Sequence, residues 1–262
     1  MKLHPHWAVT ALFVGALGAS TFAHAASVSG QGTWETTLQG RDLDGNLSTA
    51  ESYYDTSLNI TWLADANYAQ TTGYDADGAM IWTTATAWAA GLNPYGSGIT
   101  GWRLPTTIDA DGPDADALGN DGCDWTPSVY QGLDCGYNNT THSEMSHMFY
   151  VTLGDKAFFD TSGLTQPDYG LINTGPFSNF GSGPDYWSAT EYAPDTNGAW
   201  HFTIHLGVQV ADPKTVSYYA WAVHSGDVGA AVAPVQVPAA IWLFGSGLVG
   251  LFGLARRRAR PA

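Results

Sequence analysis

The distribution of charge constrains this chain more than any other sequence feature. All 24 acidic residues lie within residues 26–238, whereas residues 1–25 and 239–262 contain none. Only four basic residues share the acidic stretch, so its surface repels phosphate backbones. With 44% hydrophobic and 13% aromatic residues, the chain is too apolar to be a disordered acidic tail. The sequence therefore predicts a folded acidic body between two apolar ends and excludes a nucleic-acid partner.

The N-terminal end has the pattern of a secretory signal peptide. Lys2 precedes an apolar run, and the run closes with Ala23-His24-Ala25, a small-x-small cleavage pattern. We expect residues 1–25 to be removed on export, with Ala26 as the mature first residue.

The C-terminal end has the pattern of a membrane anchor. Residues 239–255 are uncharged and apolar, which is the short limit for a transmembrane helix, and a basic tail at 256–262 follows. The arginines keep the tail cytoplasmic, so the acidic body faces outward. Residues 229–238 are rich in Ala, Val and Pro and are expected to form a stalk.

The order of these C-terminal elements resembles a PEP-CTERM sorting signal of the VPLPA variant. The motif residues are Val235, Val237, Pro238 and Ala239, with Gln236 where the variant usually has proline. The resemblance implies a Gram-negative bacterium, an exosortase as processing partner, and a final location at the cell surface or in the extracellular matrix.

Hydrophobic periodicity predicts one α+β domain over residues 26–228, with a small antiparallel sheet, two helices and long loops. The helices are expected at 79–92, ended by Gly91, and at 142–153, opened by a capping box from Thr141 to Glu144. Alternation of apolar residues predicts strands, the one over residues 199–206 being half-buried. The other strands are expected at Thr33–Leu38, Leu58–Leu63, Tyr186–Tyr192 and Tyr219–Val223.

Cys123 and Cys135 lie in one Asp/Gly-rich loop. In an exported protein, such a pair is expected to form a disulfide, worth about 3 kcal/mol on the chain-entropy model. A catalytic thiol is the alternative.

Several ordered segments resemble the Lcl C-terminal-domain family, named for a collagen-like bacterial adhesin. They are Tyr53-Tyr54-Asp55 with Leu58-Asn59-Ile60-Thr61-Trp62-Leu63, Gly101-Trp102-Arg103-Leu104-Pro105-Thr106, Ser143-Glu144-Met145 with His147, Tyr186-Trp187-Ser188-Ala189-Thr190-Glu191-Tyr192 and Ala220-Trp221-Ala222-Val223. The resemblance covers roughly residues 50–228 and implies a C-type-lectin-like fold. The family's namesake is associated with sulfated glycans, which the acidic charge of this chain disfavours.

Aspartate clusters are the candidate calcium ligands, because calcium takes six to eight oxygens and binds weakly in many extracellular modules. The alternative is a set of Asx turns on a soluble surface. The candidate ligands are Asp42, Asp44, Asp75, Asp77, Asp109, Asp111, Asp114 and Asp116.

Arg103 is expected to form an ion pair with Glu144 or Glu191, with ligand binding as the alternative. His201 and His205 fall on the polar face of their predicted strand, where a solvated face is favoured over a ligand or metal site. Aromatic residues near the cysteine loop are candidates for stacking on sugars, namely Trp125, Tyr130 and Tyr137.

These features favour a non-enzymatic binding or adhesion module, with extracellular polysaccharide as a candidate partner and calcium as a candidate cofactor. Two other readings stay open. One is an enzyme that modifies exopolysaccharide through Glu144, Glu191 or a histidine, although no catalytic motif is present. The other is a purely structural matrix component.

Overall fold

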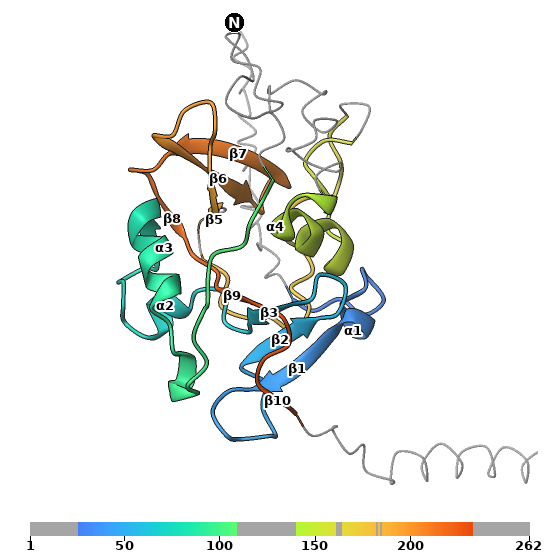
Figure 1. Cartoon of the computed structure of the whole chain (residues 1–262). Coiled ribbons are helices and arrows are strands. Elements are labelled where there is room, and N and C mark those ends of the chain that lie inside the picture. The colour runs from blue at the N-terminus through green and yellow to red at the C-terminus, as the bar shows by residue number, and fades with distance from the viewer. Residues whose placement is uncertain (1–25, 109–139, 161–163, 182, 184, 233–262) are drawn as a thin grey trace, which may run out of the picture.

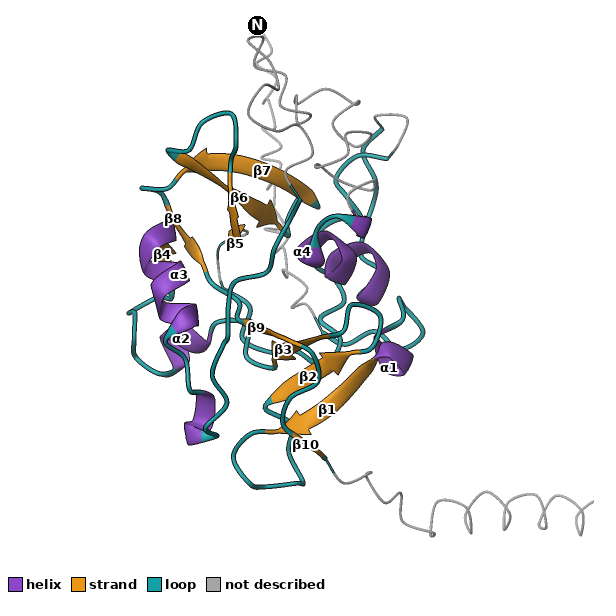
Figure 2. Ribbon diagram, viewed as in Figure 1, coloured by secondary structure: helices purple, strands orange, loops and turns teal. Residues whose placement is uncertain are grey.

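The computed structural model describes residues 26–108, 140–160, 164–181, 183 and 185–232. Within these residues the chain is α+β, with two five-stranded sheets and a few short helices (Figures 1 and 2). The predicted α+β class is confirmed. The prediction of one small sheet is wrong, because the strands divide between two sheets of equal size.

The first sheet has the strand order β10-β1-β2-β3-β9, and all of its pairs are antiparallel. It joins strands from both ends of the described chain, as the blue and red ribbons of Figure 1 show. Its strands are β1 (Leu38–Asp42), β2 (Ser52–Asp55), β3 (Ile60–Leu63), β9 (Val223–Ser225) and β10 (Ala230–Ala231).

The second sheet has the strand order β4-β8-β5-β6-β7. Strands β5 and β8 pair in parallel at Tyr186 and Tyr219, so this sheet is mixed rather than antiparallel. Its strands are β4 (Ala79–Ile81), β5 (Asp185–Glu191), β6 (Gly198–Thr203), β7 (Val208–Pro213) and β8 (Ser217–Tyr219).

The helices are short, and the longest, α3, covers one side of the second sheet in Figure 2. They are α1 (Trp34–Thr37), α2 (Tyr68–Thr71), α3 (Trp82–Ala90), the 3-10 turn η1 (Pro94–Gly96), α4 (Glu144–His147) and the π-helical turn η4 (Met148–Thr152).

The two predicted helices are present with altered starts. Helix α3 ends at Gly91 as predicted, but residues 79–81 form strand β4 instead of its first turn. Helix α4 is capped by Ser143, whose side chain accepts the N–H of Ser146 at 3.2 Å. The capping box from Thr141 is therefore wrong, because the carboxylate of Glu144 binds elsewhere in the fold.

The strand predicted over Thr33–Leu38 is also wrong, since residues 34–37 form α1. The carbonyl oxygen of Thr33 accepts the N–H groups of Thr36 and Thr37, both at 2.9 Å. The hydroxyls of the same two threonines bond back to that carbonyl. Local side-chain bonds of this kind compete with an extended backbone, and here they close a turn.

Strand β6 is not half-buried, because all six of its residues are buried. Ala199 and Phe202 belong to the main core, and Trp200 packs in a smaller cluster with Ala157 and Val208. The alternating stretch 219–223 is likewise not one strand. It leaves the second sheet after Tyr219 and enters the first at Val223.

The crossing segment Ala220–Ala222 carries the centre of the aromatic core. The ring centroid of Trp221 lies 4.6 Å from that of Trp62 in β3 and 4.8 Å from that of Phe177. Its indole N–H donates to the carbonyl oxygen of Leu63 at 2.8 Å. Tyr186 of β5 also contacts the Trp221 ring, at 6.3 Å between centroids. One buried indole therefore links both sheets.

No helix among the described residues is long and apolar enough to cross a membrane. The predicted signal peptide (1–25) and the predicted transmembrane helix (239–255) lie outside the described residues.

Candidate functional site

Arg103 forms the predicted ion pair with Glu144. Its Nη1 and Nη2 lie 2.6 and 2.7 Å from the two carboxylate oxygens, a bidentate arrangement. Glu144 also accepts the backbone N–H of Thr106 at 2.7 Å. The pair thus connects the start of α4 to the extended segment that contains Arg103 and Thr106. The other predicted partner, Glu191, is paired with Lys214 instead.

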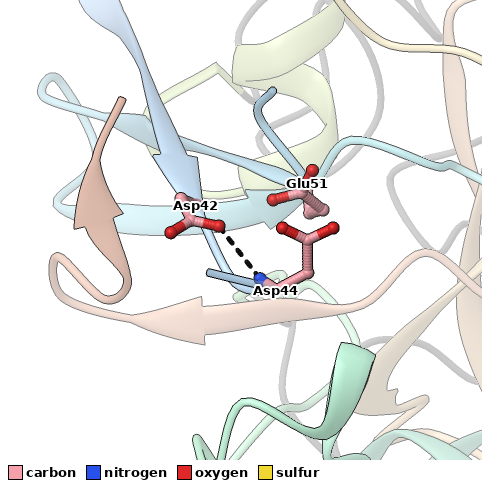
Figure 3. A group of neighbouring side chains, drawn as sticks. All are labelled: Asp42, Asp44 and Glu51. Atoms are coloured by element: carbon pink, nitrogen blue, oxygen red, sulfur yellow. Dashed lines mark hydrogen bonds between the residues drawn. The ribbon is translucent and has the colours of Figure 1, made fainter. Parts of the chain in front are cut away.

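Three carboxylates converge at the loop between β1 and β2. One oxygen from each of Asp42, Asp44 and Glu51 lies within 4.8 Å of the others, and Figure 3 shows the three side chains facing one another. Asp42 and Glu51 are buried, at 6% and 8% exposure. Asp42 and Asp44 are predicted calcium ligands, whereas Glu51 is an addition that the structure supplies.

The loop backbone holds these carboxylates in place. Asp42 Oδ1 accepts the N–H groups of Asp44 and Gly45 at 3.0 and 2.8 Å, which is an Asx turn. Glu51 Oε2 accepts the N–H of Leu43 at 3.0 Å. The pairing of Arg41 with Ser52 across the hairpin brings Glu51 to the start of the turn.

The second Asp-x-Asp-Gly segment forms the same turn without a third acid. Asp75 Oδ1 accepts the N–H groups of Asp77 and Gly78 at 3.1 and 3.0 Å. The bond from the N–H of Ala79 lowers the pKa of Asp77, with a further contribution from Asp75. No cluster of three metal-ligating side chains forms there within the described part of the chain. Asp75 and Asp77 therefore lie in a plain Asx turn.

The other predicted site residues lie outside the described residues. They are Asp109, Asp111, Asp114, Asp116, Cys123, Cys135, Trp125, Tyr130, Tyr137, Val235, Val237, Pro238 and Ala239.

His201, which the sequence placed on a solvated strand face, is buried in the second sheet. His201 is 3% exposed, so the expectation of a solvated strand face is wrong for this residue. Its Nδ1 lies 3.3 Å from Asp185 Oδ1, and its Nε2 lies 3.0 Å from Asp212 Oδ2. Both ring nitrogens lie within ion-pair distance of a carboxylate, which favours the doubly protonated ring, because a neutral imidazole has only one N–H.

The surroundings of His201 maintain this charge. Burial disfavours the charged ring, but the two carboxylates outweigh it and raise the pKa of His201 above its usual value. His201 in turn lowers the pKa of Asp212. The phenol of Tyr218 donates to Asp212 Oδ2 at 2.6 Å and stacks on the imidazole at 4.4 Å between centroids.

Asp212 also lines a small pocket at the edge of the second sheet. The pocket has a volume of about 170 Å³ and lies between the β5–β6 turn and the end of β7. Tyr192, Asp195 and Asn197 contribute from the turn, and Pro213 follows Asp212 on the strand. No sequence pattern indicated this pocket. Its two walls, the β5–β6 turn and the end of β7, are brought together only by the pairing of strands.

The chain matches no protein-family model, and comparisons with curated proteins and with solved structures find no match to either.

Proposed function

We propose that this protein is an exported, non-enzymatic binding or adhesion module of a bacterial surface or extracellular matrix, and that the loop from Asp42 to Glu51 binds calcium. The convergence of three carboxylates, two of them buried, carries the proposal. All three are hard oxygen ligands, which calcium prefers.

The electrostatics of the loop favour a cation. None of the ion pairs found among the described residues includes Asp42, Asp44 or Glu51. Burial raises the pKa of Tyr53, and the charge of Glu51 raises it further. Burial likewise raises the pKa of Tyr95, with contributions from Glu51 and Asp44 among other charged groups. Carboxylates that are buried together without a counter-ion are costly, and a divalent cation would remove that cost.

The rest of the proposal comes from the sequence. The signal peptide and the PEP-CTERM-like end support export, a membrane-anchored stage and an exosortase as partner. The resemblance to the Lcl C-terminal-domain family supports a C-type-lectin-like fold and binding of extracellular polysaccharide. The large excess of acidic over basic residues in 26–238 disfavours sulfated glycans and nucleic acid.

The enzyme alternative receives less support than the binding module. Glu144 is held by Arg103 and Glu191 by Lys214, so neither carboxylate is available as an acid or base without breaking an ion pair. A purely structural matrix role predicts self-association without ligand binding. A glycan array with the purified protein separates that role from the binding module.

A calcium titration of the purified full-length protein, followed by thermal unfolding, tests the metal site. At 10 mM calcium and dissociation constants of about 10⁻⁴–10⁻³ M, the stabilisation is about 1.4–2.7 kcal/mol. We expect Glu51→Gln and Asp44→Asn to abolish it. Asp44 Oδ1 accepts the N–H of Asn46 at 2.8 Å, and asparagine keeps that acceptor, so the second variant removes only charge.

The second turn provides the matched control. Asp77→Asn makes the same substitution in the same Asp-x-Asp-Gly context, and it should leave the calcium response unchanged. Absence of a response in the wild type, or an equal loss in Asp77→Asn, would refute the calcium site.

A further inference from the structure

The pocket that Asp212 lines, beside His201, has the properties of a ligand-binding subsite. It is separate from the loop from Asp42 to Glu51. Its walls combine carboxylates with apolar surface. Asp195 and Asp212 supply the charge, and Tyr192, Ala211 and Pro213 supply the apolar contacts. The ring of Tyr192 is fixed by edge-on packing against Trp200, with 5.3 Å between centroids.

Asp212 is a preorganised carboxylate. Its Oδ2 is held by His201 at 3.0 Å and by the Tyr218 phenol at 2.6 Å. Its Oδ1 accepts no hydrogen bond from the described residues. A carboxylate whose geometry is fixed by buried partners loses little freedom when a ligand binds to its other oxygen.

Asp195 is arranged in a comparable way. Its Oδ1 accepts both the backbone N–H of Asn197 at 3.0 Å and the side-chain amide of Asn197 at 2.9 Å. Its Oδ2 accepts no hydrogen bond from the described part of the chain. Each wall of the pocket therefore presents a carboxylate with one oxygen that accepts no hydrogen bond from the described residues.

None of the described residues that line the pocket has a basic side chain. The nearby Lys214 is committed to other groups, since it pairs with Glu191, donates to the carbonyl of Thr196 at 2.6 Å and lies over the Trp82 ring. An anionic ligand would therefore meet two carboxylates, of which only Asp212 is paired with a cation, the buried His201, whereas a ligand with a positive charge would be attracted by both.

We propose that this pocket binds a cationic sugar unit, a hexosamine with a free ammonium group. The ammonium and hydroxyl groups would donate to Asp195 and Asp212, and the C–H face of the ring would contact Tyr192 and Pro213. This inference rests on the proposed binding function and names its ligand class. It does not depend on the loop from Asp42 to Glu51, which connects two strands of the first sheet.

Binding of a glucosamine oligosaccharide to the full-length protein, measured by calorimetry, tests the proposal. The fully N-acetylated oligosaccharide and a glucuronate-containing one serve as neutral and anionic probes. We expect the cationic probe to bind about tenfold more tightly than the neutral one and the anionic probe not to bind, with the preference weakening at high salt.

Asp195→Asn is the main variant, because Asp195 is exposed and asparagine retains the turn acceptor. It should weaken the cationic probe about tenfold and leave the neutral probe unchanged. Asp77→Asn, at an exposed aspartate of the same turn type, should change neither. Asp212→Asn should act like Asp195→Asn, provided that its far-ultraviolet circular dichroism matches the wild type.

The outcomes separate this inference from the proposed function. Equal binding of neutral and cationic probes, or undiminished binding in Asp195→Asn, overturns the hexosamine subsite even if the protein binds another polysaccharide. Loss of calcium binding in Glu51→Gln with intact glucosamine binding supports the subsite. Failure of every glycan probe in the wild type removes the glycan function and this inference together, while a calcium response would still stand.

Discussion

Asp155 is a buried carboxyl group whose ionisation should control the pH dependence of stability. It is 5% exposed and follows the turn η4. Its Oδ1 accepts hydrogen bonds from the side chain of Gln31 at 3.0 Å and from the N–H groups of Ile172 and Asn173 at 3.1 and 2.9 Å. Its Oδ2 is buried and has no hydrogen-bond partner among the described residues. Burial outweighs the three donors and raises the pKa of Asp155 to about 7.

The size and sign of the effect follow from this pKa. A rise from 3.8 to about 7 corresponds to about 4 kcal/mol, since each pKa unit is worth about 1.4 kcal/mol. Because the folded-state value is the higher one, the folded protein binds the proton more tightly than the unfolded chain. The contribution of Asp155 is therefore fully present below about pH 4, is lost as the pH rises to about 7, and stays constant above that.

Asp155→Asn isolates this contribution. Asparagine keeps an acceptor oxygen for the three donors and cannot ionise. We expect the variant to match the wild type within about 1 kcal/mol at pH 4 and to be more stable by about 3–4 kcal/mol at pH 8. Urea denaturation at pH steps between 4 and 8 measures the difference. Asp168→Asn, at an exposed aspartate, serves as the control.

A difference between Asp155→Asn and the wild type that stays constant from pH 4 to pH 8 would refute the reasoning. It would mean that the carboxyl group titrates equally in the folded and unfolded chains, so that burial does not raise its pKa.

Two further predictions concern the other charged groups of the fold. Glu144→Gln should destabilise the protein by about 1–3 kcal/mol in urea denaturation, because the half-buried guanidinium of Arg103 loses its bidentate partner. The double variant Arg103→Met with Glu144→Leu should recover much of that stability, and no recovery would argue against the ion pair. His201→Phe should lower the free energy of unfolding by about 3 kcal/mol at pH 6, because two carboxylates lose their shared cation. This loss of stability should shrink as the pH rises through the raised pKa of His201. A loss that is independent of pH would show that the ring is neutral throughout.

The sequence predicted those elements whose signals are local. Helix α3 follows from the spacing of its apolar residues and from Gly91 at its end. An ion pair of Arg103 was predictable because few bases share the acidic body, but the sequence left Glu144 and Glu191 open as its partner, and the fold selects Glu144. The division into two sheets was not predictable in this way. The stretch from Tyr219 to Val223 alternates regularly, yet only the packing of Trp221 between the sheets determines where the chain crosses.

The two candidate sites illustrate the same limit. Asp42 and Asp75 head identical Asp-x-Asp-Gly segments and make identical turns, so no local pattern distinguishes them. The difference is Glu51, which only the register of the β1–β2 hairpin brings to the first turn.

The position of His201 between two aspartates depends on the register of two strand pairs. It pairs with Trp187 in β5 and with Val210 in β7, and each aspartate lies two residues from one of these partners. Diagonal neighbours on adjacent strands share a face of the sheet and lie within reach of long side chains. The charge cluster, and the pocket that Asp212 lines, are therefore properties of strand pairing. A shift of one residue in either register would point the aspartate to the opposite face and remove the cluster.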